Sequence, residues 1–183
     1  MAKIGLKYIV GAKYNVTNNA VSYTDGLVLG KGISADITIG MSDVKLYADD
    51  AIAESIKDFQ SGTISIGLDE LDNNALAFIS GHTADSTNGE IIKNISDVAP
   101  YIGVGFYGAV IRNGVRKIRC VWLPRTIFSI PANTFATKAD SPAFTTPTME
   151  GEILADIAGN WEIDRVVATE DEAVEWLNGK AGI

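Results

Sequence analysis

Two residue types that often carry out catalysis or bind metals occur only once each in this chain: His82 is its one histidine and Cys120 its one cysteine. A serine-histidine-aspartate triad would have to use His82, and no serine of the chain lies in a Gly-x-Ser-x-Gly motif. A zinc site draws on several His and Cys ligands at short spacings, which this pair does not provide. The sequence therefore predicts no catalytic residue, no metal site and no cofactor.

Both residues have a structural interpretation instead. His82 follows Gly81 at the end of a helical pattern, where an imidazole can meet free carbonyl groups at the negative end of the helix dipole. Cys120 lies inside an apolar strand pattern, which predicts a buried and inert thiol.

Gly103, Gly105 and Gly108 match the spacing Gly-x-Gly-x-x-Gly, which binds a pyrophosphate only where a strand turns into a helix. Here the run continues into Val110, Ile111 and an Asn-Gly turn, so these glycines lie inside a strand. We interpret them as sites where another backbone or an aromatic ring comes close.

Charged residues gather in two clusters of opposite sign. The acidic cluster lacks the spacing of a calcium-binding loop and is interpreted as a solvated or subunit-facing surface; it consists of Asp49, Asp50, Glu54 and Asp58. The basic cluster has one interleaved aromatic residue, Trp122, and is expected to meet an acidic surface of a neighbouring subunit; it consists of Arg112, Arg116, Lys117, Arg119 and Arg125. Opposite clusters on one chain allow head-to-tail contact between copies.

Length and composition indicate one folded domain spanning residues 1–183. Apolar residues make up 46% and charged residues 21% of the chain, and no apolar run reaches the roughly 20 residues of a membrane span. We expect a protein made in a reducing cytoplasm. The formal charge of −8 argues against a protein that grips nucleic acid. A charge of this sign keeps an unassembled subunit soluble and equally suits a channel to which a polyanion does not stick, and charge alone does not choose between these two uses.

Alternation of apolar and polar residues predicts a chain dominated by strands. Strands are expected at residues 4–15, at 27–41 with a break at Gly30-Lys31-Gly32, at 63–68, at 127–130 and at 151–169. The clearest signal is a β-hairpin between Tyr101 and Leu123, joined by Asn113-Gly114.

Two short helices are expected among these strands. The first starts at Asp69 or Asp72 and ends at Gly81; the second follows a capping box of Thr169 and Glu172 and ends at Gly179. Residues 43–60 fit either a short helix or a twisted extended arm, and the Pro-rich residues 131–149 are expected to form a loop or edge excursion. The expected class is α+β, mostly β, with a sandwich-like architecture.

Several stretches, taken in order, resemble the major tail proteins of long-tailed bacteriophages with non-contractile tails. They are KIGLKYIVGAKY, VKLYADDAIAES with GTISIGLDEL, the hairpin between Tyr101 and Trp122, and TKADSPAFTTPTMEGEI, so that the resemblance covers about residues 2–155. It implies a β-sandwich-like tube fold with a flanking helix. It further implies hexameric rings that stack through extended loops into a virion tail tube, through which DNA is ejected without specific binding.

The same resemblance implies tape-measure, tail-tip and tail-terminator proteins as partners, and no membrane. Two loop-like segments that contain apolar residues, 43–58 and 134–147, are our hypothesised contacts between copies. The candidate contact residues are Asp43, Leu46, Tyr47, Asp49, Asp50, Glu54, Arg112, Arg116, Arg119, Phe135 and Phe144. A carbohydrate-binding or adhesion module, with Trp122 or Trp161 as a stacking platform, is the alternative.

Overall fold

A computed structural model describes residues 2–48, 51–85, 87–112, 114–132 and 146–183. Most of this part of the chain is strand, and every strand pair is antiparallel. The elements in chain order are β1 (Ala2–Thr17), β2 (Ala20–Gly30), β3 (Gly32–Ala48), β4 (Ala51–Leu68), α1 (Asn73–Ser80), β5 (Thr83–Asp85), β6 (Glu90–Ile92), β7 (Ile102–Arg112), β8 (Val115–Phe128), β9 (Thr148–Leu154), β10 (Ile163–Val167) and α2 (Glu170–Ala181). The expected class, α+β and mostly β, is confirmed.

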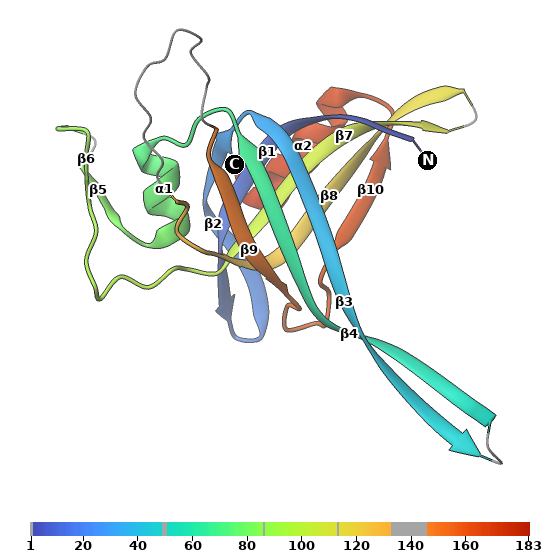
Figure 1. The fold of residues 1–183 in the computed structure, drawn as a ribbon. Coiled ribbons are helices and arrows are strands. Elements are labelled where there is room, and N and C mark those ends of the chain that lie inside the picture. Colours follow the sequence, from blue (N-terminus) through green and yellow to red (C-terminus); the bar gives the residue numbers. More distant parts are fainter. Residues whose placement is uncertain (1, 49–50, 86, 113, 133–145) are drawn as a thin grey trace, which may run out of the picture.

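One large sheet runs in the order β2-β1-β7-β8-β9-β4-β3 and is strongly curved (Figure 1). Strand β8 changes its neighbour along its length, pairing with β10 at residues 118–122 and with β9 at residues 125–128. Pro124 lies at this change, where the register of β8 against β7 also shifts. A proline fits there because its missing N–H falls at a bulge of the ladder.

The expected strand at residues 127–130 is therefore wrong as a separate element. Ile127 and Phe128 are the last residues of β8, which continues past Pro124 by means of this bulge. Before Pro124, the expected hairpin of β7 and β8 is confirmed, with Gly114 at a φ of 76°.

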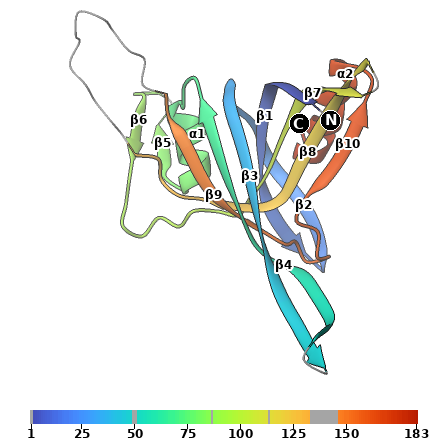
Figure 2. The ribbon, with the colours of Figure 1, turned by 45° about the vertical axis from the view of Figure 1, so that its right-hand side comes forward.

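The curvature of the sheet brings its two halves face to face around one apolar core. Ile64 and Ile66 of β4 and Met149 of β9 share this core with Ile9 of β1 and Leu123 of β8. This is the sandwich-like part of the fold, and Figure 2 shows the β9-β4-β3 half lying across β1 and β2. Helix α1 closes one end of the core with Phe78 and Ile79; its caps are Asp72 and Gly81, as expected.

The other face of β1, β7 and β8 packs against α2. Trp122 and Val10 point to this side because side chains alternate along a strand, and they meet Leu177 of the helix. The expected capping box is confirmed, since Thr169 accepts from the Glu172 N–H while Glu172 accepts from the Thr169 N–H. The predicted end at Gly179 is wrong, because the helix continues through it to Ala181.

Gly182, with a φ of 72°, is the actual cap of α2. Its N–H donates to the carbonyl of Asn178, as the left-handed conformation of a terminal glycine permits.

The expected continuous strand at residues 151–169 is two strands with a turn between them. Asp156 accepts hydrogen bonds from the N–H groups of Ala158 and Asn160, each at 2.8 Å, and Gly159 takes a φ of 85°. This turn separates β9 from β10 and returns the chain to the other half of β8.

None of the helices that the structure describes is both long enough and apolar enough to cross a membrane.

Candidate assembly surfaces

The far parts of β3 and β4 form a two-stranded ribbon, residues 41–59, which we call the arm. Strands β3 and β4 pair with each other from Met41, opposite Phe59, to Ala48, opposite Ala51. Within the described residues no third strand joins them there, because β9 pairs only with residues 62–67 of β4. Both views show the arm projecting away from the rest of the molecule (Figures 1 and 2). The extended alternative for residues 43–60 is thus confirmed for the described residues.

The arm exposes apolar side chains. Met41 is 49% and Ile56 54% exposed, although they lie in regular strands. A two-stranded ribbon alone is only marginally stable in water, so an arm of this kind gains from a third strand or a packed face supplied from outside the chain.

The candidate contact residues between positions 43 and 54 belong to the arm or lie outside the described residues. Asp43 is exposed and its carboxylate lies 3.2 Å from the Lys45 ammonium. Leu46, Tyr47 and Glu54 lie in the paired strands of the arm. Asp49 and Asp50, like Phe135 and Phe144 of the second predicted segment, lie outside the described residues.

The aromatic residues of the alternative function are not a free platform. Trp122 is fully buried, with Tyr23 edge-on at 5.1 Å, so its assignment as a sugar-stacking surface is wrong. Trp161 stacks on Phe59 at the base of the arm, with ring centroids 5.1 Å apart and an interplanar angle of 4°.

The outward face of β3, β4 and β9 is polar and acidic. Because the inner residues of these strands face the core, their neighbours form two rows across the sheet, which we call the acidic face: Asp36, Ser65 and Glu150 in one row, and Thr38, Thr63 and Glu152 in the other. Three of these six side chains are carboxylates and none is basic. The acidic face repels a polyanion.

Three arginines of the predicted basic cluster, Arg116, Arg119 and Arg125, have partners within the chain. Arg119 binds Asp164, and its Nη2 lies 3.4 Å from Glu162; the hydrogen bond with Asp164 is the main cause that raises the pKa of Arg119. The guanidinium of Arg125 lies over the ring of Tyr101 at 4.1 Å. Arg112 is the last residue of β7.

Arg116 belongs to a second network, centred on Glu170 at the start of α2. The Glu170 carboxylate lies 2.9 Å from Lys7 Nζ and 3.6 Å from Arg116 Nη2, and it accepts from the Tyr107 hydroxyl at 3.2 Å. The hydrogen bond from Lys7 is the main cause that lowers the pKa of Glu170. Burial, followed by the charge of Glu170, raises the pKa of Tyr107 to about 12.

The prediction that the imidazole of His82 contacts free carbonyl groups at the end of α1 is wrong. Its imidazole is buried, and Nδ1 lies 2.7 Å from the carboxylate of Asp97, which also accepts from the Asn94 N–H at 2.8 Å. No local pattern in the sequence indicates this pair, because Asp97 approaches through a loop that returns past the end of α1.

The glycine and cysteine interpretations are confirmed. A Cβ on Gly103 or Gly105 would lie 2.5–2.6 Å from the ring of Trp122, and one on Gly108 would lie 2.6 Å from the carbonyl oxygen of Gly5. Cys120 is fully buried, and burial raises the pKa of its thiol to about 11.

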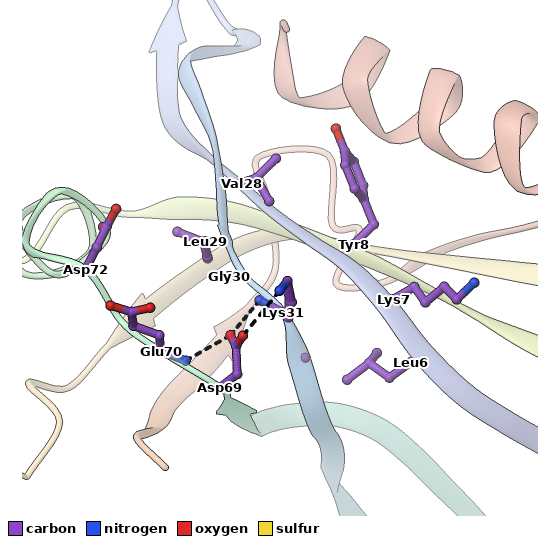
Figure 3. A pocket seen from close by; sticks show the side chains of 11 residues that line it. Leu6, Lys7, Tyr8, Val28, Leu29, Gly30, Lys31, Asp69, Glu70 and Asp72 are labelled. Atoms are coloured by element: carbon purple, nitrogen blue, oxygen red, sulfur yellow. Dashed lines mark hydrogen bonds and ion pairs between the residues drawn. The ribbon is translucent and has the colours of Figure 1, made fainter. Parts of the chain in front are cut away.

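A hollow of about 550 Å³ lies where β2 passes into β3 (Figure 3). Leu6, Val28 and Leu29 give it an apolar wall, and the carboxylate of Asp69 accepts from the N–H groups of Lys31 at 3.0 Å and Glu70 at 2.8 Å. The described residues that line this hollow include no Cys, Ser or Thr as a nucleophile and no His as its general base. The bonds of Asp69 join the β2-β3 turn to the start of α1.

Within the described residues, no group of three or more His, Cys, Asp and Glu side chains has the geometry of a metal site. The chain matches no protein-family model, and its sequence matches no curated protein.

Proposed function

We propose that this chain is the structural subunit of a bacteriophage tail tube, which assembles with copies of itself into stacked hexameric rings around a channel for DNA ejection. The observation that carries the proposal is the arm. It extends beyond the sheet as a ribbon, exposes Met41 and Ile56, and has no third strand within the described residues. A second copy of the chain supplies what such an arm lacks.

The charge of the subunit supports the same role. Six copies carry a formal charge of −48, six times the −8 of one chain. The acidic face concentrates Asp36, Glu150 and Glu152 on one surface of the sheet. A conduit lined with such a surface passes DNA without counterion release, and therefore without holding it.

Trimming the arm tests the proposal. Residues 44–56 are replaced by Asn-Gly, which joins the paired residues Asp43 and Lys57 through a hairpin turn and keeps the stack of Phe59 on Trp161. We expect the trimmed chain to keep the melting temperature of the native chain, because the removed ribbon pairs mainly with itself. We expect it to form no tubes in negative-stain electron microscopy.

The matched control is Val166→Thr, which removes an exposed apolar side chain from β10 and leaves the arm intact. This variant is expected to form tubes as the native chain does. If the trimmed chain formed stacked tubes of native length, the arm would not be needed for assembly, and the main support for this function would be lost.

A further inference from the structure

The turn between β6 and β7, residues 92–98, presents three apolar side chains to solvent. Ile95 is fully exposed, Val98 is 79% exposed and Ile92 is 58% exposed. Such a concentration of exposed aliphatic residues on one short turn is typical of a contact surface. We call this segment the 92–98 turn.

This turn is held in place by its own hydrogen bonds. The side chain of Asn94 accepts from the Ser96 N–H at 3.0 Å, the Asp97 N–H donates to the Asn94 carbonyl at 3.1 Å, and Asp97 binds the Asn94 N–H in return. Buried His82 anchors Asp97 to the end of α1. Ile95 is therefore fixed in an outward position, and a partner that covers it needs little ordering of the chain.

A second surface on the molecule is a groove between β3 and the strands β1, β7 and β8, with a volume of about 540 Å³. Its wall is apolar and includes Leu6, Ala35, Ile37 and Ile39, which contact the core but stay partly exposed. Its charged side chains are those of Glu162 and Arg119, because the side chain of Asp36, whose backbone also borders the groove, belongs to the acidic face. We call it the β3 groove.

The two surfaces lie on different sides of the subunit. The 92–98 turn follows β6, and β5 and β6 lie at one side in both views, whereas β10 and the N-terminus lie at the other (Figures 1 and 2). The β3 groove is on this second side, because it is lined by Leu6 near the start of β1 and by Glu162 directly before β10. One surface of one copy can therefore reach the other surface of a second copy.

Their charges are complementary. Lys93, in the 92–98 turn, is the one lysine or arginine between positions 58 and 111. In and beside the β3 groove, two carboxylates, those of Glu162 and Asp164, bind the single guanidinium of Arg119. The excess negative charge of the groove suits the ammonium group of Lys93, because the one carboxylate of the turn, that of Asp97, is bound to His82 and to the Asn94 N–H.

We infer that the 92–98 turn of one copy docks into the β3 groove of the next copy, and that this head-to-tail contact closes the ring. Because donor and acceptor surfaces differ, each subunit uses both, and such a contact forms a ring when the rotation between neighbours closes. The inference rests on the proposed function for its setting in a ring, and the contact between copies is tested separately.

Site-specific crosslinking tests the contact. Ile95→Cys places a thiol on the turn and Ala35→Cys places one in the groove, while Cys120 is fully buried in both variants. Each purified variant, and their equimolar mixture, is treated with a short bismaleimide and analysed on a denaturing gel. We expect crosslinked dimers in the mixture only. The double variant is expected to give a ladder that ends at the size of the closed ring.

Lys93→Glu in the Ile95→Cys chain is expected to reduce the dimer yield by roughly two- to fivefold, as for the loss of an exposed ion pair. Lys31→Glu, which makes the same charge change at another exposed site, is the control and is expected to leave the yield unchanged.

The outcomes separate the contact from the proposed function. Mixed dimers without rings or tubes would support the contact and contradict the tail-tube role. Tubes without mixed dimers would support the tail-tube role and contradict the contact. Equal crosslinking of Ile95→Cys alone would show a symmetric turn-to-turn contact and overturn the inference, as would the absence of mixed dimers in any sample.

Discussion

At the scale of single residues, Trp122 explains why β7 has glycine at positions 103 and 105. The indole of Trp122 lies over β7 and fills the space that side chains at positions 103 and 105 would occupy. Leu177 of α2 approaches the same place, so the helix contacts the sheet closely where Gly105 lies.

We predict that Gly105→Ala lowers the free energy of unfolding by about 1–3 kcal/mol, because the new Cβ would lie 2.6 Å from carbons of Leu177 and Trp122. The control is Gly179→Ala, which has open space in the interior of α2 and is expected to raise it by about 0.5–1 kcal/mol. Urea unfolding of the three proteins measures both changes, and a Gly105→Ala protein as stable as the native one would contradict the packing described.

Acid stability is a second property set by single residues. The pKa of Glu170 is held below its ordinary 4.5 mainly by Lys7, and the pKa of Asp97 is held below 3.8 mainly by the Asn94 N–H. Lowered pKa values in the folded state give stability that is complete above these ordinary values and lost as pH falls through the lower folded values.

We therefore predict that Glu170→Gln is less stable than the native chain at pH 7 and that its melting temperature falls less between about pH 5 and pH 3. Glu175→Gln, on the exposed side of the same helix, is the control for the loss of one charge. Parallel acid dependence of the native and Glu170→Gln proteins would contradict a role for the Lys7 contact.

At the scale of elements, α2 is an integral layer of the fold. Strand β10 pairs with β8, and α2 buries Ala173, Leu177 and Ala181 against the sheet. This C-terminal segment thus covers the fully buried Trp122.

We predict that Leu177→Ala lowers the free energy of unfolding by about 2–5 kcal/mol, because it leaves a cavity beside Trp122. Glu175→Ala, on the exposed side of α2, is expected to change it by less than about 0.5 kcal/mol. Thermal unfolding followed by tryptophan fluorescence measures both, and equal effects would mean that α2 is only loosely attached.

Elements with strong local signals could be predicted from the sequence. The alternation of Ile64, Ile66 and Leu68 predicts the last third of β4, and Asp72 and Gly81 bound α1, because each signal depends on neighbours in the sequence. The turn at Asp156 was missed because its bond pattern interrupts an otherwise alternating run. The sequence predicts a cap at Gly179 because a glycine near a helix end has the same local signature whether or not the helix continues.

Contacts between distant segments could not be predicted in this way. Lys7 meets Glu170 across 163 positions, and His82 meets Asp97 only because the chain turns back after β6. Arg119 was expected to serve a neighbouring subunit, and its partners Glu162 and Asp164 come from a segment that the sequence pattern had joined to β9. The surfaces of the arm and the β3 groove likewise depend on the curvature of the whole sheet.

At the scale of the whole molecule, the subunit has two apolar cores and several surfaces that no other part of the described chain covers. The cores are covered on both sides of β1, β7 and β8, which gives a stable body. The arm projects from that body, and β6, which leads into the 92–98 turn, lies on another side of it (Figure 1). The β3 groove opens between β3 and the strands β1, β7 and β8. In the proposed tail tube, these surfaces would serve neighbours within a ring and neighbours along the tube.

The central claim is that copies of this chain recognise one another and enclose a channel. Electron microscopy of the purified native chain at increasing concentration, with averaging of end-on views, tests it directly. We predict rings or tubes of uniform diameter with six-fold symmetry and an open centre. Particles that remain single subunits at every concentration, or that assemble without a central channel, would contradict the account.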